Sequence, residues 1–205
     1  MNDVNKSDFW EELYRNNTVA WDLRTPTPAF IDLLNSEYFL NKKKMLVVGC
    51  GYGYDAIEAA KKGFNVTALD FSDTAIEFAK TLAGKEKVSV NFLVEDFFNL
   101  NTSFLNSFEI IFDYVTYCAI DPARRKEYAD KISQLLKPEG LFAIILFPVE
   151  NRVGGPPFAV DVNEATNFFS EKLELIISTD KINSIKPRKG REFLQIYRKP
   201  NGAQS

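Results

Sequence analysis

Histidine is absent from the 205 residues of this chain. It is the side chain that most often serves as a general base near neutral pH, and it is the commonest metal ligand. Its absence leaves carboxylates and tyrosines as the available bases. We therefore expect no metal site, and we expect any catalysed reaction to use a reactant that needs no strong base.

Cysteine and long apolar runs are also scarce. The two cysteines, Cys50 and Cys118, fall in a predicted turn and at the end of a predicted strand, which is not the pattern of a disulfide framework. No apolar run approaches the ~18 residues of a membrane span. Residues 1–8 are polar and lack the apolar core of a signal peptide. We therefore expect a reduced, cytoplasmic protein with no membrane partner.

Basic residues show no excess. The 25 lysines and arginines are balanced by 28 acidic residues, so the net charge is −3 and no nucleic-acid partner is expected. An apolar content of 45% over 205 residues suffices for the full core of one large domain. Because the chain shows no repeat, linker or low-complexity tract, we predict a single domain over residues 1–205, as a monomer or weak homodimer.

The most informative segment is residues 45–55. An apolar run there breaks into three glycines at alternate positions, Gly49, Gly51 and Gly53, and a helix-forming stretch follows at once. This pattern predicts a buried strand, a tight turn and a helix start, because glycine tolerates positive φ angles and lets the backbone approach a ligand closely.

An acidic residue completes the pattern. Asp70 directly follows the next apolar run, residues 64–69, and precedes Phe71 and Ser72. A carboxylate at the end of the second strand can accept hydrogen bonds from both hydroxyls of a ribose. The segment therefore predicts a cofactor that contains adenosine.

The glycine spacing argues against a dinucleotide. A pyrophosphate-binding turn reads Gly-x-Gly-x-x-Gly, whereas the third glycine here comes one position early. Asp55 then falls near the helix start, where it would repel a pyrophosphate. A cationic cofactor without phosphate, S-adenosylmethionine, fits better. A nicotinamide-dependent oxidoreductase and a glycine turn that binds no ligand remain as alternatives.

Strands and helices alternate along the chain, which predicts a doubly wound, mostly parallel α/β sheet with helices on both faces. Strands are predicted at residues 45–48, 64–69, 88–94, 109–114 and 141–147, and helices at 9–17, 29–34, 55–62, 73–82 and 122–136. A turn is predicted at residues 137–140. Two late apolar runs, 173–178 and 193–197, predict an antiparallel pair at one edge, which makes seven strands.

The carboxyl ends of the parallel strands are the expected site, because ligands bind there in open sheets. Gly51, Gly53, Phe71 and Ser72 are therefore cofactor-binding candidates together with the residues named above. After the third predicted strand, the Asp96 carboxylate can accept from the exocyclic amine of adenine while the Phe97 ring packs on the base. A helix cap is an equally open interpretation of Asp96.

Three further segments carry a resemblance to a known family. They are the aromatic N-terminal stretch at 10–28, residues 112–122 and residues 154–160, and the charged tail at 186–190 adds to the match. With the glycine turn, they resemble the thiopurine S-methyltransferase superfamily of class I S-adenosylmethionine-dependent methyltransferases, whose fold is Rossmann-like. Within it, the chain looks most similar to the plant-type thiol and halide methyltransferases.

The resemblance implies that residues 1–36 form N-terminal lid helices over the cofactor. Trp10, Tyr14 and Trp21 fall on lid positions that contact ligand, and aromatic faces attract a sulfonium cation. The other residues on family cofactor or active-site positions are Gly49, Asp70, Asp96, Phe97 and Tyr114.

The resemblance also implies an acceptor site. Thiopurine-type members carry arginine where this chain has Tyr114, and plant-type members tend to carry tyrosine where it has Phe158. We therefore expect a small soft nucleophile (a thiol, hydrosulfide, thiocyanate or halide), with Tyr114 as the catalytic residue that orients it. Trp21, Cys118 and Phe158 are expected to line the site.

Arg152 is expected either to draw anions to this site or simply to be exposed. An O- or N-methyltransferase, with Asp113 or Glu150 as its base, and a non-catalytic S-adenosylmethionine-binding module remain as alternatives.

Overall fold

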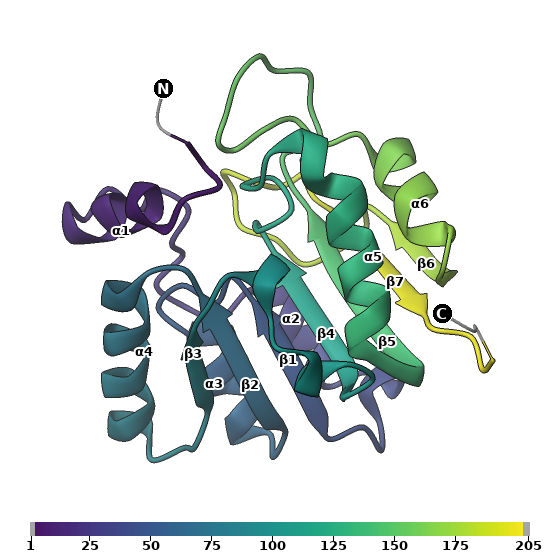
Figure 1. The fold of residues 1–205 in the computed structure, drawn as a ribbon, viewed down its shortest axis with the longest axis horizontal. Helices are drawn as coiled ribbons and strands as arrows, with labels where there is room; N and C mark the ends of the chain where they lie inside the picture. Colours follow the sequence, from purple (N-terminus) through teal and green to yellow (C-terminus); the bar gives the residue numbers. More distant parts are fainter. Residues whose placement is uncertain (1–2, 203–205) are drawn as a thin grey trace. The chain divides into compact units, whose positions relative to one another are not determined.

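The structure, a computed structural model, describes residues 3–202. The chain divides into two compact parts, the first ending at Leu100 and the second beginning at Asn101. Both parts contain helices and strands (Figure 1).

The first part contains three parallel strands in the order β3-β2-β1. The strands β1 and β2 pair from Lys44 with Asn65 to Val48 with Leu69, and Asp70 pairs with Val94 of β3. The elements of this part are α1 (Ser7–Arg15), α2 (Pro28–Leu34), β1 (Lys44–Val48), α3 (Tyr54–Lys61), β2 (Asn65–Asp70), α4 (Asp73–Glu86) and β3 (Asn91–Val94).

Two short loops at the carboxyl ends of β1 and β2 position the site in this part. The glycine turn leads from β1 into α3, whose N-cap Gly53 is left-handed with a φ of 80°. The loop after β2 leads into α4, whose N-cap Ser72 accepts a hydrogen bond from the backbone N–H of Ala75. Helix α4 packs on β2 and β3, and α1 packs on α4 (Figure 1).

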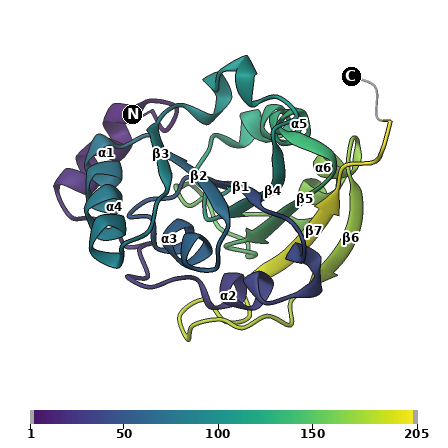
Figure 2. The ribbon, with the colours of Figure 1, turned by 90° about the horizontal axis from the view of Figure 1, so that it is seen from below.

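The second part contains the strands β4-β5-β7-β6 in that order. Strands β4 and β5 are parallel, whereas β7 is antiparallel to both β5 and β6. Helices α5 and α6 pack on each other, and they also pack on β5 and β6 respectively (Figure 2). The elements of this part are β4 (Phe108–Tyr114), α5 (Arg125–Leu135), β5 (Leu136–Leu146), α6 (Val162–Ser170), β6 (Glu174–Thr179) and β7 (Phe193–Arg198).

Within residues 3–202 the strands number seven, and they make the mostly parallel sheet with an antiparallel edge pair that the sequence predicts. The prediction of a turn at residues 137–140 is wrong, because this segment lies inside β5. Phe108 pairs with Leu136 and Ile110 pairs with Leu141, so the intervening residues are accommodated as an irregularity with Glu139 at a φ of 61°.

One helix and two element boundaries also differ from the sequence prediction. Helix α6 was not predicted, and β3 begins three residues later than expected, at Asn91. The helix expected from Pro122 starts as a 3-10 turn, Pro122–Arg124, before α5. Among residues 3–202, no helix has the length and apolar character needed to span a membrane.

Candidate functional site

Asp70 holds the glycine turn in place. Its Oδ2 accepts a hydrogen bond from the backbone N–H of Gly51 at 2.8 Å, and its Oδ1 accepts one from Ser72 at 3.0 Å. Burial raises the pKa of Asp70, and these backbone donors oppose that shift. The backbone N–H of Phe71 is a third donor to this carboxylate, which has about four lone-pair positions, so the group can still accept a hydrogen bond from a ligand.

The three glycines of the turn all have positive φ angles, of 56°, 51° and 80° for Gly49, Gly51 and Gly53. A Cβ on Gly51 would lie 2.9 Å from the hydroxyl oxygen of Tyr14. A Cβ on Gly53 would lie 2.8 Å from that of Ala79. Gly51 therefore permits the approach of an aromatic side chain, and Gly53 permits the packing of α3 against α4.

Aromatic rings from the N-terminal segment gather beside the glycine turn. Tyr14 is buried, and its ring centroid is 5.7 Å from that of Trp21 and 5.2 Å from that of Tyr52. Trp21 is also 5.7 Å from Trp10. Burial, and then the charge of Asp70, raises the pKa of Tyr14 well above its ordinary value, so its phenol is neutral. The structure thus brings the three predicted lid aromatics into one cluster, which Tyr52 joins although the sequence did not single it out.

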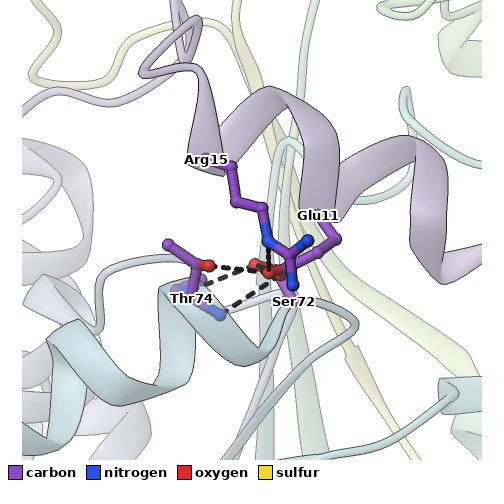
Figure 3. Close-up of polar contacts among 5 residues, drawn as sticks. Glu11, Arg15, Ser72 and Thr74 are labelled. Carbon is purple, nitrogen blue, oxygen red and sulfur yellow. Dashed lines mark hydrogen bonds and ion pairs between the residues drawn. The ribbon is translucent and has the colours of Figure 1, made fainter.

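Glu11 joins α1 to the beginning of α4 (Figure 3). Its Oε2 accepts hydrogen bonds from the Ser72 hydroxyl at 2.5 Å and the Thr74 backbone N–H at 3.2 Å. Its Oε1 accepts from the Thr74 hydroxyl and from Arg15 Nε, both at 2.7 Å. Burial favours a higher pKa for Glu11, but the hydrogen bonds from Ser72, Thr74 and Arg15 outweigh it and lower the pKa to about 2. This carboxylate is therefore ionised and fixes the helix that carries Trp10 and Tyr14.

Asp55 makes a second link between N-terminal and core elements. It accepts hydrogen bonds from the backbone N–H of Thr27 at 2.6 Å and from its hydroxyl at 2.8 Å. Thr27 is the residue before α2, so Asp55 ties the start of α2 to the start of α3. Burial raises the pKa of Asp55 to about 6, although the Thr27 donors oppose the shift.

Asp96 caps a 3-10 helix, Phe97–Asn99. Its Oδ1 accepts from the backbone N–H of Phe98 at 2.9 Å, and its Oδ2 accepts from the side-chain amide of Asn99 at 2.7 Å. Phe97 is buried and Phe71 is half-buried. The helix cap that the sequence left open is thus present, and one lone pair on each oxygen of Asp96 remains for a ligand.

In the second part of the chain, Tyr114 is the last residue of β4 and belongs to a buried polar cluster. Its hydroxyl donates a hydrogen bond to Glu192 Oε1 and accepts one from Arg188, while Ser184 donates to Glu192 Oε2. Tyr114, Arg188 and Glu192 are 8%, 5% and 5% exposed. Burial raises the pKa of Tyr114, and the Arg188 charge offsets only part of that shift.

The Arg188 guanidinium is held between two aromatic rings. Its central carbon is 5.0 Å from the ring centroid of Tyr114 and 4.9 Å from that of Phe147. Sequence reasoning missed both Arg188 and Glu192. The only signal was the charged segment 186–191, which contains Arg188 and directly precedes Glu192. The sequence predicts an exposed loop there, because no local pattern indicates that these two charged side chains are buried.

Cys118 and Phe158 are brought together by the backbone. The N–H of Phe158 donates to the carbonyl of Cys118 at 2.7 Å. Burial, with a smaller contribution from Asp113, raises the pKa of the Cys118 thiol to about 12. The next segment is anchored by buried Arg125, which donates to the carbonyl of Ala159 at 2.8 Å. Cys118 is thus an uncharged, buried side chain that adjoins the segment carrying Phe158.

Arg152 lies on the exposed segment 151–155. Its guanidinium is 3.6 Å from Glu150, which also receives a hydrogen bond from Arg191 at 2.8 Å. Of the two interpretations offered for Arg152, exposure is therefore the one the structure displays.

Asp113, the other carboxylate considered as a base, is fully buried and satisfied. It accepts from the Tyr128 hydroxyl at 2.9 Å and from the backbone N–H groups of Thr116 and Tyr117 at 3.0 and 3.1 Å. Burial raises its pKa to about 6 against these donors. Among residues 3–202, no group of three or more histidine, cysteine or carboxylate side chains is arranged to hold a metal.

The first part therefore fits S-adenosylmethionine. Asp70 keeps an acceptor position for a ribose hydroxyl, and the neutral aromatic cluster suits a sulfonium. Asp55 stands close after the glycine turn, where a phosphate would be repelled.

Comparison with known proteins agrees with this fit. A family model described as Thiopurine S-methyltransferase (TPMT) matches residues 5–197. The chain is 36% identical over 200 residues to "Probable thiol methyltransferase 2" of Arabidopsis thaliana, covering 95% of this chain and 86% of that protein. It is 33% identical over 199 residues to "Thiocyanate methyltransferase 1" of the same plant, covering 94% and 85%.

A solved structure shares the fold at lower identity. Burkholderia thailandensis 1,6-didemethyltoxoflavin-N1-methyltransferase, with bound 1,6-didemethyltoxoflavin and S-adenosylhomocysteine, aligns with a TM-score of 0.72 and 21% identity over 97% of this chain and 88% of that chain. The resemblance, the fold class and the cofactor predicted from the sequence are confirmed. The chain belongs to the thiopurine S-methyltransferase family and is an S-adenosylmethionine-dependent methyltransferase.

Proposed function

We propose that this enzyme transfers the methyl group to a small soft nucleophile: a thiol, hydrosulfide, thiocyanate or halide. The observation that carries the proposal is the state of Asp113, the base that an oxygen or nitrogen acceptor would need. Its two oxygens accept four hydrogen bonds, from the Tyr128 hydroxyl, the backbone and side chain of Thr116 and the backbone of Tyr117. Glu150 is likewise engaged with two arginines. A soft nucleophile reacts without a strong base, and the names of the plant relatives support this class.

On the cofactor side, we assign each predicted residue a role that its geometry supports. Asp70 binds the ribose, Asp96 and Phe97 hold the adenine, and the Trp10, Tyr14 and Trp21 cluster covers the sulfonium end. Gly49, Gly51 and Gly53 let the turn approach the cofactor, and Phe71 and Ser72 complete the loop after β2. When bound, S-adenosylmethionine supplies an electrophilic methyl group on a positively charged sulfur, and the protein contributes alignment and exclusion of water.

On the acceptor side, we assign the catalytic role to Tyr114 through its hydroxyl. Cys118 and Phe158 line the acceptor site, and we propose that Trp21 contacts the acceptor as well as the cofactor. Phe158 in place of tyrosine gives this wall one hydroxyl fewer than plant-type members tend to have. Arg152 is exposed, so we propose for it only the attraction of anions from solvent.

The test is methyl transfer from labelled S-adenosylmethionine to a panel of acceptors. The panel contains hydrosulfide, a small thiol, thiocyanate, iodide and a thiopurine, with catechol as the oxygen control. Product on the sulfur or halide acceptors with none on catechol is the expected result. Product on catechol alone would replace the proposal with an O-methyltransferase, and tight cofactor binding without any product would favour a binding module.

We propose further that the enzyme works on a small molecule in the cytoplasm as a monomer or weak homodimer, without nucleic-acid or membrane partners. The net charge of −3 and the two unpaired cysteines support this proposal. Sedimentation of the purified protein tests the oligomeric state.

A further inference from the structure

The Tyr114 hydroxyl has committed its only proton. A phenol has one O–H donor, and here it is directed to Glu192 Oε1. Arg188 can only donate, so its contact with Tyr114 uses one lone pair of the phenol oxygen. What remains on that oxygen is a single lone pair, which accepts a hydrogen bond and cannot give one.

This arrangement discriminates among soft nucleophiles. A halide or thiocyanate ion has no proton, so it cannot donate to the free lone pair of Tyr114. The S–H of a thiol or of hydrogen sulfide is a donor, although a weak one, and can do so. The charge of Arg188 does not make the cluster cationic, because Glu192 lies in the same cluster and shares the Tyr114 hydroxyl.

Resting on the proposed function, we propose that the enzyme selects acceptors that carry a proton on sulfur, and that Glu192 receives this proton through Tyr114. An aliphatic thiol with a pKa of about 8.5 is mostly protonated at pH 7, so its reaction requires a proton acceptor. A carboxylate reached through a phenol suits a thiol, which is far more acidic than an alcohol.

The proton transfer balances. The acceptor's S–H proton passes to the Tyr114 oxygen while the Tyr114 proton passes to Glu192 Oε1, so Tyr114 ends neutral and Glu192 ends as a carboxylic acid. The freed sulfur electron pair forms the new bond to the methyl carbon. The bond between that carbon and the cofactor sulfur breaks, its electrons stay on that sulfur, and S-adenosylhomocysteine is released.

Glu192 also has a route to return the proton to water. It lines a cavity of about 330 Å³, which is roomy enough for ordered water. Lys181 and Lys189 line the same cavity together with Asp180 and Ser184. Glu192 therefore connects the Tyr114 hydroxyl on one side with a hydratable cavity, lined in part by charged side chains, on the other.

The decisive variant is Glu192→Gln, which keeps the shape of the side chain but cannot take up a proton. The readout is the ratio of kcat/KM for a small aliphatic thiol to kcat/KM for iodide, measured at pH 7. We expect a wild-type ratio above 10 and a fall of at least 10-fold in the variant. Glu192→Asp, which restores a carboxylate, should recover part of the ratio. The matched control is Glu174→Gln. Glu174 also lies in the second part of the chain, but it pairs with Arg198 on the surface, so this substitution should leave the ratio unchanged.

Two further measurements separate proton transfer from a merely structural role. Raising the pH through the pKa of the thiol should shrink the Glu192→Gln deficit, because a thiolate has no proton to lose. Adding Glu192→Gln to Tyr114→Phe should cause little further loss of thiol methylation, since both changes interrupt one path. Cofactor affinity, measured by calorimetry, should stay within twofold of wild type in each variant.

An equal loss on thiol and iodide in Glu192→Gln, or a wild type that prefers iodide to the thiol, would overturn this inference while leaving the proposed function standing. If the wild type methylated none of the sulfur and halide acceptors of the panel, the proposed function itself would fail. If Glu192→Gln lost cofactor affinity, Glu192→Asp would replace it in the test. For the inference to stand, the ratio of kcat/KM for the thiol to kcat/KM for iodide must then fall less in Glu192→Asp than in Tyr114→Phe.

Discussion

Glu11 and Thr74 are 63 positions apart in the sequence, yet the Glu11 carboxylate accepts hydrogen bonds from both the backbone N–H and the hydroxyl of Thr74. Thr74 is the second residue of α4, and Glu11 also accepts from Ser72, the N-cap of that helix (Figure 3). An anion at a helix N-terminus is stabilised by free N–H groups and by the helix dipole. The same helix α1 bears Trp10 and Tyr14, so one polar contact fixes the aromatic cluster relative to the loop that follows Asp70.

We predict that Glu11→Gln loosens α1 and weakens cofactor binding. The substitution removes the charge from several charge-assisted hydrogen bonds, which should cost about 1–3 kcal/mol of stability. Hydrogen exchange of the α1 amides should accelerate, and the calorimetric Kd for S-adenosylmethionine should rise about 10-fold, which corresponds to ~1.4 kcal/mol.

The control for this prediction is Glu12→Gln, a change of the same chemistry at the next, exposed position of α1. Exchange and affinity should stay at wild-type values there. Similar losses in both variants would show that net charge, and not the contact with α4, explains the effect.

The second prediction concerns pH. The pKa values of Asp55 and Asp113 are raised to about 6, so their ionised forms destabilise the fold; the free energy of unfolding should rise as the pH falls from above 6 towards 4. The pKa of Glu11 is lowered from 4.5 to about 2, so its contribution is complete above pH 4.5 and is lost as the pH falls towards 2. At ~1.4 kcal/mol per pKa unit, the titration of each group should change the free energy of unfolding by on the order of 3 kcal/mol.

Urea denaturation between pH 3 and pH 8 checks this profile. Stability should pass through a maximum in mild acid, and Glu11→Gln should remove much of the decline on the acid side. A wild-type stability that only falls as the pH is lowered from 7 would contradict the assignment of the buried aspartates.

The residues that can be predicted from the sequence are those whose role follows from their spacing to close neighbours in the chain. The alternation of Gly49, Gly51 and Gly53 after an apolar run, and Asp70 at the end of the next one, specify a strand–turn–helix unit and its acidic partner through neighbours in the chain. The antiparallel edge pair was likewise visible as two apolar runs. At 137–140, local proline and glycine signals mislead, because the pairing of β4 with β5 absorbs these residues inside a strand.

The residues that sequence reasoning missed act through contacts distant in the chain. Tyr114 lies 78 positions from Glu192 and 74 from Arg188, and Glu11 lies 61 from Ser72. No periodicity in the sequence relates such partners. Because charged residues are usually exposed, the burial of Arg188 and Glu192 can be recognised only in the folded structure, where β7 begins directly after Glu192.

The third prediction tests the ribose assignment. Asp70→Ala should weaken cofactor binding by at least ~100-fold in Kd by calorimetry. It removes a charge-assisted hydrogen bond to the ligand, worth about 1.5–3 kcal/mol, and it also releases the backbone of Gly51 and Ser72. Asp73→Asn is the control, since Asp73 is a nearby exposed carboxylate at the first position of α4. Unchanged cofactor affinity in Asp70→Ala would restrict Asp70 to its observed role of holding Gly51 and Ser72.

The last prediction separates two reasons for a glycine. Gly53 and Gly63 have nearly equal φ angles of 80° and 85°, but a Cβ on Gly53 would meet Ala79 at 2.8 Å and the Phe92 ring at 3.1 Å, whereas a Cβ on Gly63 would meet nothing within 4 Å. Alanine at either position carries the backbone cost of a positive φ, about 1 kcal/mol. Gly53→Ala should carry an additional packing cost of about 1–3 kcal/mol. Urea denaturation of both variants measures the difference directly. Equal destabilisation would mean that α3 and α4 can move apart without cost. If Gly53→Ala proved stable yet bound S-adenosylmethionine poorly, close approach of the turn to the cofactor, and not helix packing, would be the reason for glycine at this position.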